Sequence, residues 1–160
     1  MWKHPRLLKD FDYIGMHRYL LTWRCDNREP TFTQADRVDL VREQILRACN
    51  ESEFEVIADC FMPDHVHKLV RGRTVTADGR KFIRKAKQYS GFYFQKEFKQ
   101  RLWQRYGRDD VIRDDEDPRP IAQYIIENPV RAGLVTRCDD YPFIGSQVYS
   151  REELIKWAYS

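Results

Sequence analysis

Two histidines stand two residues apart in the segment FMPDHVH, residues 61–67. Side chains at i and i+2 of a β-strand point to the same face, so the imidazoles of His65 and His67 would project together, about 6.5 Å apart along the backbone. Val66 would point the other way, into the core. This spacing allows both rings to bind one metal ion, but two polar side chains on the solvent-facing side of a strand show the same pattern. The histidine pair alone leaves both interpretations open.

A second pair of residues with suitable chemistry lies in QYIIENP, residues 123–129. Tyr124 and Asn128 are four residues apart, so on a helix they share one face, with Cβ atoms about 6 Å apart. The amide oxygen of Asn128 offers a third metal ligand, and the phenol of Tyr124 offers a nucleophile whose attack on a phosphate would be favoured by a nearby metal ion. Taken singly, each residue has an ordinary explanation, namely a half-buried helix tyrosine and an asparagine that ends a helix before Pro129.

The composition is that of a compact globular protein. The chain has 160 residues, of which 42% are hydrophobic and 33% charged, so we expect a single domain over residues 1–160. No apolar run is long enough to span a membrane. The N-terminal segment MWKHPRLLKDFDY has neither the apolar core nor the cleavage site of a signal peptide, so we expect a cytoplasmic protein. The cysteines form no C-x-x-C pair, which argues against a cysteine zinc site.

Positive charge is concentrated between Arg80 and Arg108, although the net charge of the whole chain is only +3. This segment has ten basic residues and a single acid, Glu97, with aromatic residues interleaved. Lysine and arginine neutralise phosphates, and aromatic rings stack on unpaired bases, so the segment is a candidate nucleic-acid surface. A solvated helix whose aromatic side chains belong to the core has the same composition. The residues of this segment that we predict to contact nucleic acid are Arg80, Lys81, Arg84, Lys85, Lys87 and Tyr89.

The hydrophobic periodicity indicates an α+β protein. The expected elements are a strand over 14–25, a helix capped by Thr33 and running to Asn50, strands over 53–61 and 65–71, a helix over 80–100, one or two short strands over 103–113, a helix over 121–127 and a short helix over 151–159. This order matches the ferredoxin-like split βαβ plan, in which helices pack on one face of an antiparallel sheet. The last helices would be C-terminal additions to that plan.

Several motifs together resemble a known family. FMPDHVHKLV resembles the HUH motif of single-tyrosine HUH (IS200-like) transposases, in which U is a hydrophobic residue. LWQRYGRDDVIRDDED followed by YIIENPVRAGLV resembles more specifically the REP-associated tyrosine transposases, which are bacterial relatives of insertion-sequence transposases. The resemblance covers residues 14–134, whereas residues 135–160 contain no motif that we can assign.

The resemblance implies a ferredoxin-like fold and a defined reaction. It implies that His65, His67 and Asn128 bind a divalent metal, Mg²⁺ or Mn²⁺, and that Tyr124 attacks single-stranded DNA. The attack would leave a 5′-phosphotyrosine link and a free 3′-OH, and the link could later be attacked to rejoin strands. The substrate would be a palindromic hairpin with a short flanking guide sequence. The protein would be bacterial and nucleoid-associated, and it would act as a monomer or a homodimer.

Some residues leave alternatives open. Lys68 follows the HUH motif where an apolar residue is expected, so it would face DNA or solvent. Tyr89 is a rival nucleophile, although base stacking or packing is the preferred role. Arg113 is a candidate for steadying the phosphate, together with Lys81 and Lys85.

The alternative function is a hairpin-binding protein that does not cut DNA, and a third is a structural metal site in a protein unrelated to DNA. Imidazoles alone suit zinc, whereas added oxygen ligands favour Mg²⁺ or Mn²⁺.

Overall fold

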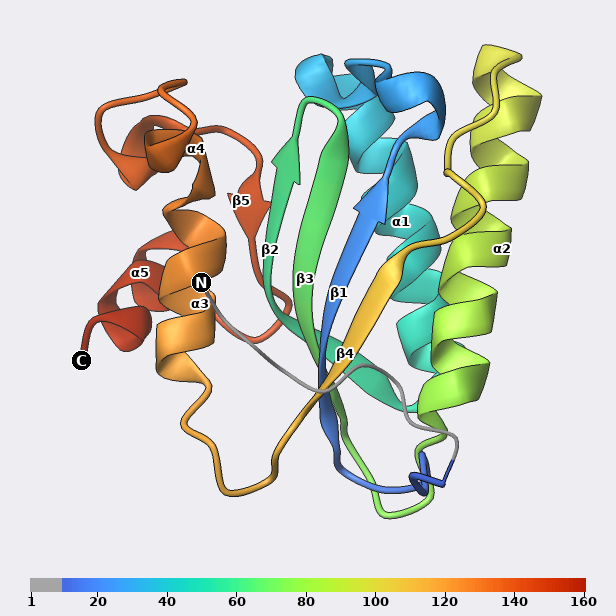
Figure 1. The fold of residues 1–160 in the computed structure, drawn as a ribbon, viewed down its shortest axis with the longest axis vertical. Coiled ribbons are helices and arrows are strands. Elements are labelled where there is room, and N and C mark those ends of the chain that lie inside the picture. The colour runs from blue at the N-terminus through green and yellow to red at the C-terminus, as the bar shows by residue number, and fades with distance from the viewer. Residues whose placement is uncertain (1–9) are drawn as a thin grey trace.

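The computed structural model describes residues 10–160, so the first nine residues of the N-terminal segment considered above lie outside the described residues. Within that range, five antiparallel strands form one sheet in the order β4-β1-β3-β2-β5 (Figure 1). The strands are β1 (Arg18–Arg24), β2 (Phe54–Met62), β3 (His65–Gly72), β4 (Arg108–Ile112) and β5 (Ile144–Gly145). The helices are α1 (Ala35–Ser52), α2 (Gly79–Phe98), α3 (Arg119–Ile126), α4 (Asn128–Arg131) and α5 (Arg151–Ala158).

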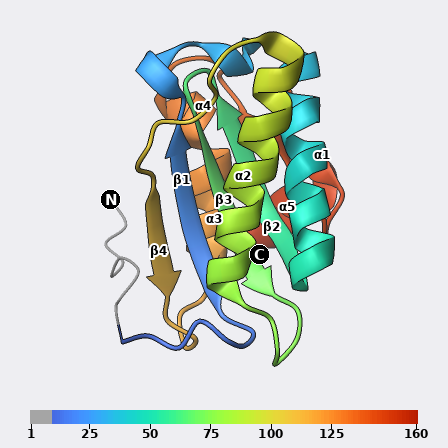
Figure 2. The same ribbon diagram turned by 90° about the vertical axis from the view of Figure 1, so that its right-hand side faces the viewer.

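The first six elements, β1-α1-β2-β3-α2-β4, form the split βαβ unit, and this confirms the expected fold class. Helices α1 and α2 lie side by side on one face of the sheet, and α3 and α5 lie on the other (Figures 1 and 2). Successive side chains of β1 point to opposite faces of the sheet. Leu21 and Trp23 therefore join the core beneath α1 and α2, while Leu20 joins the core beneath α3 and α5. The additional C-terminal helices therefore cover the face that the split βαβ unit leaves open.

The prediction that Thr33 caps the first helix is wrong. The helix α1 begins at Ala35, and its N-cap residue, Gln34, makes no capping hydrogen bond with its side chain. Thr33 lies in a 3₁₀ turn instead, where its hydroxyl donates to the carbonyl oxygen of Pro30 at 3.1 Å. The neighbouring Phe32 is fully buried, and its ring lies 5.0 Å from that of Phe61. Burial of this ring draws the chain into the turn and delays the start of the helix.

Helix α2 passes through Ser90 and Gly91 without a break. The Ser90 hydroxyl donates to the carbonyl oxygen of Ala86 at 2.6 Å and accepts from Nε1 of Trp103 at 2.9 Å. The indole of Trp103 thus packs against α2 where the helix carries the small residues Ser90 and Gly91. Of the expected strands over residues 103–113, the structure contains β4, and Trp103 adds an isolated bridge to Cys25.

The sequence predicted that the helix ends at Asn128-Pro129, but the structure shows that the chain remains helical through these residues. Helix α3 ends at Ile126, Glu127 keeps helical backbone angles, and α4 begins at Asn128. Pro129 occupies the first turn of α4, where its missing N–H leaves no hydrogen bond unmade. The break between α3 and α4 therefore changes direction without unwinding the chain.

The expectation that Lys68 faces DNA or solvent is also wrong. Lys68 is 1% exposed and lies on the face of β3 that α1 covers. Its ammonium pairs with Oδ2 of Asp59 at 3.3 Å, and Arg42 donates to Oδ1 of the same carboxylate at 2.6 Å. Burial opposes ionisation of Asp59, but the charges of Lys68 and Arg42 outweigh it and lower the pKa of the carboxyl. The buried ammonium is thus neutralised within the protein.

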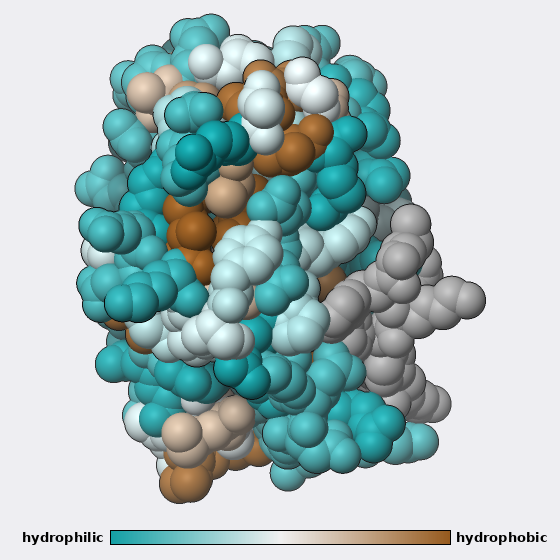
Figure 3. All heavy atoms as spheres, turned by 90° about the vertical axis from the view of Figure 1, so that its left-hand side faces the viewer, coloured by the Kyte–Doolittle hydropathy of each residue, from teal (hydrophilic) through white to brown (hydrophobic). Residues whose placement is uncertain are grey.

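The C-terminal segment joins the sheet through β5, which pairs with β2 at Asp59 and Cys60. Viewed from the side of α3 and α5, the surface is largely hydrophilic, with apolar side chains gathered mainly in its upper half (Figure 3). Among residues 10–160, no helix combines the length and apolar character needed to cross a membrane.

Candidate active site

The two imidazoles project from β3 toward the side of the sheet on which α3 lies. Their ring centroids are 4.9 Å apart and the ring planes are nearly perpendicular, at 87°. Val66 between them is fully buried in the core beneath α1 and α2. Strand β3 is central in the sheet, paired with β1 on one side and β2 on the other. The backbone that carries the histidine pair is therefore held on both edges.

One nitrogen of each ring is held by a neighbouring side chain. Nδ1 of His65 lies 2.7 Å from Oδ1 of Asp64, and Nδ1 of His67 lies 3.1 Å from the hydroxyl oxygen of Thr22. Metal-binding histidines usually donate a hydrogen bond from the nitrogen that does not bind the metal, which fixes the tautomer and the ring orientation. Both rings can thus donate from Nδ1 and keep the lone pair of Nε2 for a ligand.

The environment keeps His67 in its neutral form. Burial is the main cause that lowers the pKa of His67 to about 3, and the charges of His65, Arg131 and Arg24 act in the same direction. The neutral imidazole is the form that binds metal ions. The pKa of Asp64 is lowered as well, because hydrogen bonds from His65 and Arg28 outweigh the effect of burial. Asp64 therefore remains a carboxylate that can accept from His65.

Asn128 reaches the histidine pair from the first position of α4. Its Nδ2 atom lies 3.4 Å from Nε2 of His65. The oxygen and nitrogen of an amide are assigned from the hydrogen-bond network, and a half-turn of the group would present Oδ1 at the same place. The side chains of His65, His67 and Asn128 therefore converge from two separate elements.

Tyr124 lies on α3 beside the same pair. The centroid of its ring is 6.1 Å from that of His67, and the two rings meet edge to face at 73°. The guanidinium carbon of Arg131 lies 4.0 Å from the centroid of the Tyr124 ring, and Nη2 of Arg131 donates to the carbonyl oxygen of Tyr124 at 2.7 Å. The phenol is half-buried and has a cation against its ring.

The residues present fit a divalent metal ion. Two imidazole nitrogens with oriented rings and one amide group supply up to three protein ligands, which leaves other positions for water and phosphate oxygens. Within residues 10–160, no group of three or more His, Cys, Asp or Glu side chains is arranged to hold a metal. The third protein ligand would therefore be the amide of Asn128, and the remaining ligands would come from outside the protein.

The predicted DNA-contacting residues of α2 lie on the opposite face of the sheet. Lys85 pairs with Glu51 at 3.4 Å, and the Tyr89 hydroxyl donates to the same carboxylate at 3.0 Å. The guanidinium of Arg47 lies 4.1 Å from the centroid of the Tyr89 ring. The rival nucleophile is therefore committed to contacts with α1 and is not brought to the histidines.

The other predicted DNA contacts are distributed along α2 and at the end of β4. Arg80 stacks on the ring of Tyr13 at 4.3 Å, and Lys87 lies 5.3 Å from the ring centroid of Trp23. Arg84 is exposed and Lys81 is half-buried. Arg113 is exposed beside Asp115, with an ion-pair distance of 3.2 Å. In the described part of the chain, none of these six residues, counting Lys85, forms a side-chain hydrogen bond, ion pair or ring contact with the histidine pair.

Sequence reasoning missed four side chains that surround the site, namely Thr22, Arg24, Asp64 and Arg131. Asp64 directly precedes His65, and Arg131 is seven residues after Tyr124, which is a helical repeat. Thr22 and Arg24 alternate along the first strand, and they pair in register with His67 and His65. Local spacing could have suggested Asp64 and Arg131, but Thr22 and Arg24 depend on which strand lies beside β3.

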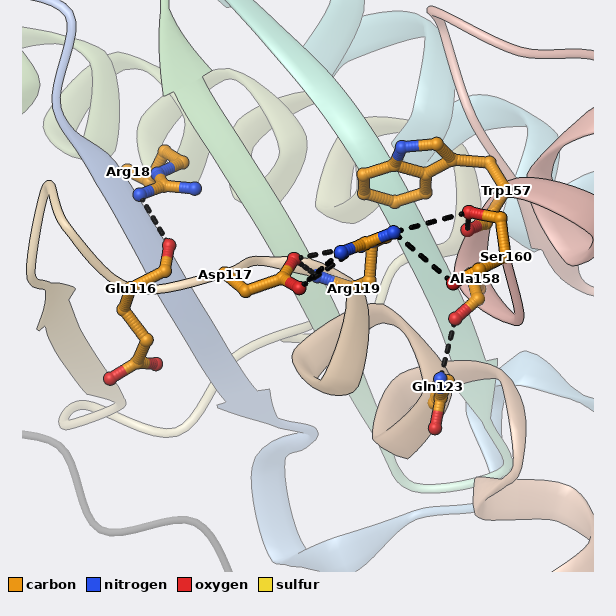
Figure 4. A network of polar contacts seen from close by, with 8 residues as sticks. All are labelled: Arg18, Glu116, Asp117, Arg119, Gln123, Trp157, Ala158 and Ser160. Atoms are coloured by element: carbon orange, nitrogen blue, oxygen red, sulfur yellow. Dashed lines mark hydrogen bonds and ion pairs between the residues drawn. The ribbon is translucent and has the colours of Figure 1, made fainter.

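The helix that carries Tyr124 is held by the C-terminal residues (Figure 4). Nε2 of Gln123 donates to the carbonyl oxygen of Ala158 at 2.5 Å, and Nη1 of Arg119 donates to the carbonyl oxygen of Ser160 at 3.1 Å. Leu154 is fully buried in the core that α3 shares with α5. The segment without an assigned motif thus positions the candidate nucleophile.

Comparisons with known proteins agree with this arrangement. The family described as Transposase IS200 like matches residues 14–126. A Haemophilus influenzae protein assigned as a REP-associated tyrosine transposase is 27% identical over 147 residues, which cover 84% of this chain and 81% of that protein. The expected resemblance is confirmed.

Two solved structures share the fold. One is a REP-associated tyrosine transposase bound to a REP hairpin, with a TM-score of 0.70 and 24% identity, covering 90% of this chain and 82% of that one. The other is described as a transposase from Deinococcus radiodurans R1, with a TM-score of 0.53 and 24% identity, covering 76% of this chain and 97% of that one.

Proposed function

Since this chain belongs to the IS200-like transposase family, we propose that it cuts and rejoins single-stranded DNA through a covalent bond to Tyr124. The observation that carries the proposal is the meeting of Tyr124 with His65 and His67 on one face of the sheet, with the Tyr124 and His67 rings 6.1 Å apart. A phosphate held by the histidine side of the site would lie within reach of the phenol. Phosphodiester transfer depends chiefly on such positioning and on charge neutralisation.

The proposed substrate is a DNA hairpin with an unpaired flank. The structural relative that shares the fold at a TM-score of 0.70 was solved with a REP hairpin. Because the proposed reaction exchanges one phosphodiester for another ester of phosphate, it needs no nucleotide cofactor. We propose that the protein acts in the bacterial cytoplasm, at the nucleoid.

In the proposed reaction, the phenol oxygen of Tyr124 attacks the scissile phosphorus. The new bond joins tyrosine oxygen to phosphorus, the bond from phosphorus to the 3′ oxygen breaks, the phenol proton is lost, and the 3′ oxygen gains a proton. The products are a 5′-phosphotyrosine link and a 3′-OH, and attack by a hydroxyl on the link reverses the step. The guanidinium of Arg131 lies against the Tyr124 ring and would stabilise the negative charge that develops there.

A divalent ion, Mg²⁺ or Mn²⁺, held by His65, His67 and Asn128, would neutralise charge on the non-bridging phosphate oxygens. Asp64 and Thr22 would orient the two imidazoles through their hydrogen bonds to Nδ1.

A denaturing gel with labelled single-stranded hairpin DNA and Mn²⁺ tests the proposal. We expect a band of protein covalently attached to DNA that is absent in Tyr124→Phe, in His65→Ala and after chelation of the metal. Tyr89→Phe is the matched control, and it should keep the band because Tyr89 lies on the opposite face of the sheet. A gel shift that survives every substitution, with no covalent band from wild type, would instead support a hairpin-binding protein that does not cut.

A further inference from the structure

A hollow lies between β1 and β4, on the same face of the sheet as the histidine pair. Its volume is about 260 Å³ and it is lined by Thr22, Arg24, Gln104, Tyr106, Gly107 and Arg108. Pockets that enclose a whole small-molecule ligand usually measure about 300–1,000 Å³. The hollow is therefore better suited to one unit of a polymer that crosses it than to a free ligand.

The hollow is continuous with the histidine pair through β1. Thr22, in the lining of the hollow, contacts Nδ1 of His67, and the two residues are paired in register between β1 and β3. Arg24, two residues further on, is paired with His65 in the same way, and its charge acts on His67. A strand of DNA with its phosphate at the histidines would thus have its next nucleotide at this hollow.

The lining offers the groups that a nucleotide needs. Within residues 10–160, the guanidinium of Arg24 has no hydrogen-bond or ion-pair partner and is exposed. Arg108 uses Nε to bind Asp110 at 2.8 Å, and its side chain remains 44% exposed. Tyr106 is 76% exposed, which is unusual for an aromatic ring that contributes to no core. The guanidinium of Arg105 lies 5.3 Å from the centroid of the Tyr106 ring, so a base would stack on the other face of the ring. Two cations and one exposed ring match a phosphate and a base.

Gly107 keeps the outer wall of the hollow close to β1. A Cβ atom at this position would lie 2.6 Å from the side chain of Trp23 and 3.2 Å from the carbonyl oxygen of Thr22. Only glycine allows this approach, which holds the flanking Tyr106 and Arg108 beside the strand. The same hypothetical atom would lie 3.1 Å from Nζ of Lys87, so α2 contributes one further cation around the edge of the sheet.

We propose that this hollow binds one unpaired nucleotide of the DNA strand next to the scissile phosphate, with Arg24 and Arg108 on its phosphate and Tyr106 stacked on its base. The inference rests on the proposed function, because it places the hollow along the path of the cleaved strand. It extends that function by assigning the recognition of the unpaired flank to the β1–β4 edge, away from the basic face of α2.

The test uses the full chain with Tyr124→Phe, so that binding is measured without covalent attachment. The probes are a fluorescent DNA hairpin with an unpaired flank of mixed sequence and the same hairpin with a blunt end, with binding followed by anisotropy. Tyr106→Ala should weaken binding of the flanked hairpin by about 5- to 150-fold, the range measured for loss of one stacked base, and leave the blunt hairpin unchanged. Tyr106→Phe should retain the affinity.

Two further variants make the test specific. Arg24→Gln should reduce the slope of log affinity against log salt by about 0.7 for the flanked probe, as expected for one lost phosphate contact on a single strand. Phe92→Ala is the control, because Phe92 is an aromatic residue 61% exposed on α2, on the opposite face. Loss of flank affinity in Phe92→Ala but not in Tyr106→Ala would overturn the inference and place the flank on α2.

The outcomes separate this inference from the proposed function. If wild type forms the covalent band and binds the flanked hairpin more tightly than the blunt one, but Tyr106→Ala and Arg24→Gln do the same, only the assignment of the hollow fails. If wild type neither binds either hairpin nor forms the band, the proposed function fails and the assignment fails with it.

Discussion

Each imidazole of the histidine pair is oriented by a hydrogen bond at its Nδ1 atom. For His65 the partner is a carboxylate, Asp64, at 2.7 Å, and for His67 it is the hydroxyl of Thr22 at 3.1 Å. A carboxylate partner makes the ring a stronger donor to metal than a hydroxyl does, because it shares negative charge with the imidazole. The two histidines of one motif are therefore supported unequally.

Replacing Asp64 tests this inequality. We expect Asp64→Ala to weaken binding of Mn²⁺ by about 10- to 100-fold, the usual cost of losing such a supporting group, and Asp64→Asn to weaken it less because an acceptor remains. Titration calorimetry with Mn²⁺, without DNA, measures the affinity directly. Arg28→Ala is the matched control, since it removes the other partner of Asp64 but no hydrogen bond to the ring. Equal affinities in Asp64→Ala and wild type would refute the supporting role.

The buried pair of Lys68 and Asp59 is a second feature at this scale. Removing one partner of a buried ion pair leaves an uncompensated charge, so Asp59→Ala, which takes the carboxylate away from the buried Lys68, should reduce the free energy of unfolding by about 3–5 kcal/mol. Lys85→Ala, which removes a lysine paired with Glu51 closer to the surface, should cost about 0–1 kcal/mol. Urea unfolding of both variants gives the comparison. Similar small losses in the two would show that the buried pair does not stabilise the fold.

The same pair predicts a dependence of stability on pH. Because the pKa of Asp59 is lowered in the folded protein, its contribution is present above the unfolded value of about 3.9 and is lost as the pH falls through the folded value. Asp59→Asn should therefore be less stable than wild type near neutral pH, and the difference should shrink below about pH 4. Unfolding curves at several pH values check this, and a constant difference would contradict it.

At the scale of elements, α5 decides where α3 lies. The cap of α5 is complete, because the Ser150 hydroxyl accepts from the Glu153 amide and the Glu153 carboxylate accepts from the Ser150 amide. The buried Leu154 then packs into the core shared with α3. The position of Tyr124 therefore depends on residues 30 positions further along the chain.

Leu154→Ala probes this dependence. We expect a loss of about 2–5 kcal/mol in the free energy of unfolding, because a cavity forms beneath α3. We also expect a lower rate of adduct formation at unchanged hairpin affinity, since Tyr124 moves while the DNA-binding surfaces stay in place. Glu152→Ala, at an exposed position of the same helix, should change the stability by less than about 0.5 kcal/mol. An adduct rate equal to wild type in a destabilised Leu154→Ala would separate α5 from the site.

At the scale of the whole molecule, the candidate site is assembled within one chain. Helix α3 packs on β2 and β3 of its own sheet, and the C-terminal residues hold it there. Exchange of α3 between two copies would have to break the hydrogen bonds of Gln123 and Arg119 and expose the apolar face of α3. In this arrangement the tyrosine of α3 lies beside the histidines of its own chain.

Mixing two inactive variants tests this arrangement. His67→Ala lacks the histidine pair and Tyr124→Phe lacks the nucleophile, so each alone should form no adduct. If the site belongs to one chain, an equimolar mixture should also form none, whereas exchange of α3 would create some intact sites and restore a fraction of the adduct. The covalent band on a denaturing gel measures the outcome, with wild type diluted into Tyr124→Phe as the control for detection.

Local spacing by itself determined much of this protein. The period of two placed His65 and His67 on one face of a strand, and the period of 3.6 placed Tyr124 and Asn128 on one face of a helical path. The order of elements was sufficient for the ferredoxin-like class, which the structure confirms. These features depend on contacts among neighbours in the chain, and such contacts can be inferred from the pattern of side chains.

Only the tertiary structure decided which side chains face one another and which are buried. The pattern of α2 is the same whether its basic side meets DNA or its aromatic residues meet α1, and packing placed Tyr89 beside Glu51 on the face away from the histidines. Likewise, Lys68 is polar in sequence but buried in the fold, because Asp59 and Arg42 lie beside it. Each of these outcomes depends on the face of the sheet that a distant segment covers. Local periodicity carries no information about that choice, which is made by the burial of two separate cores.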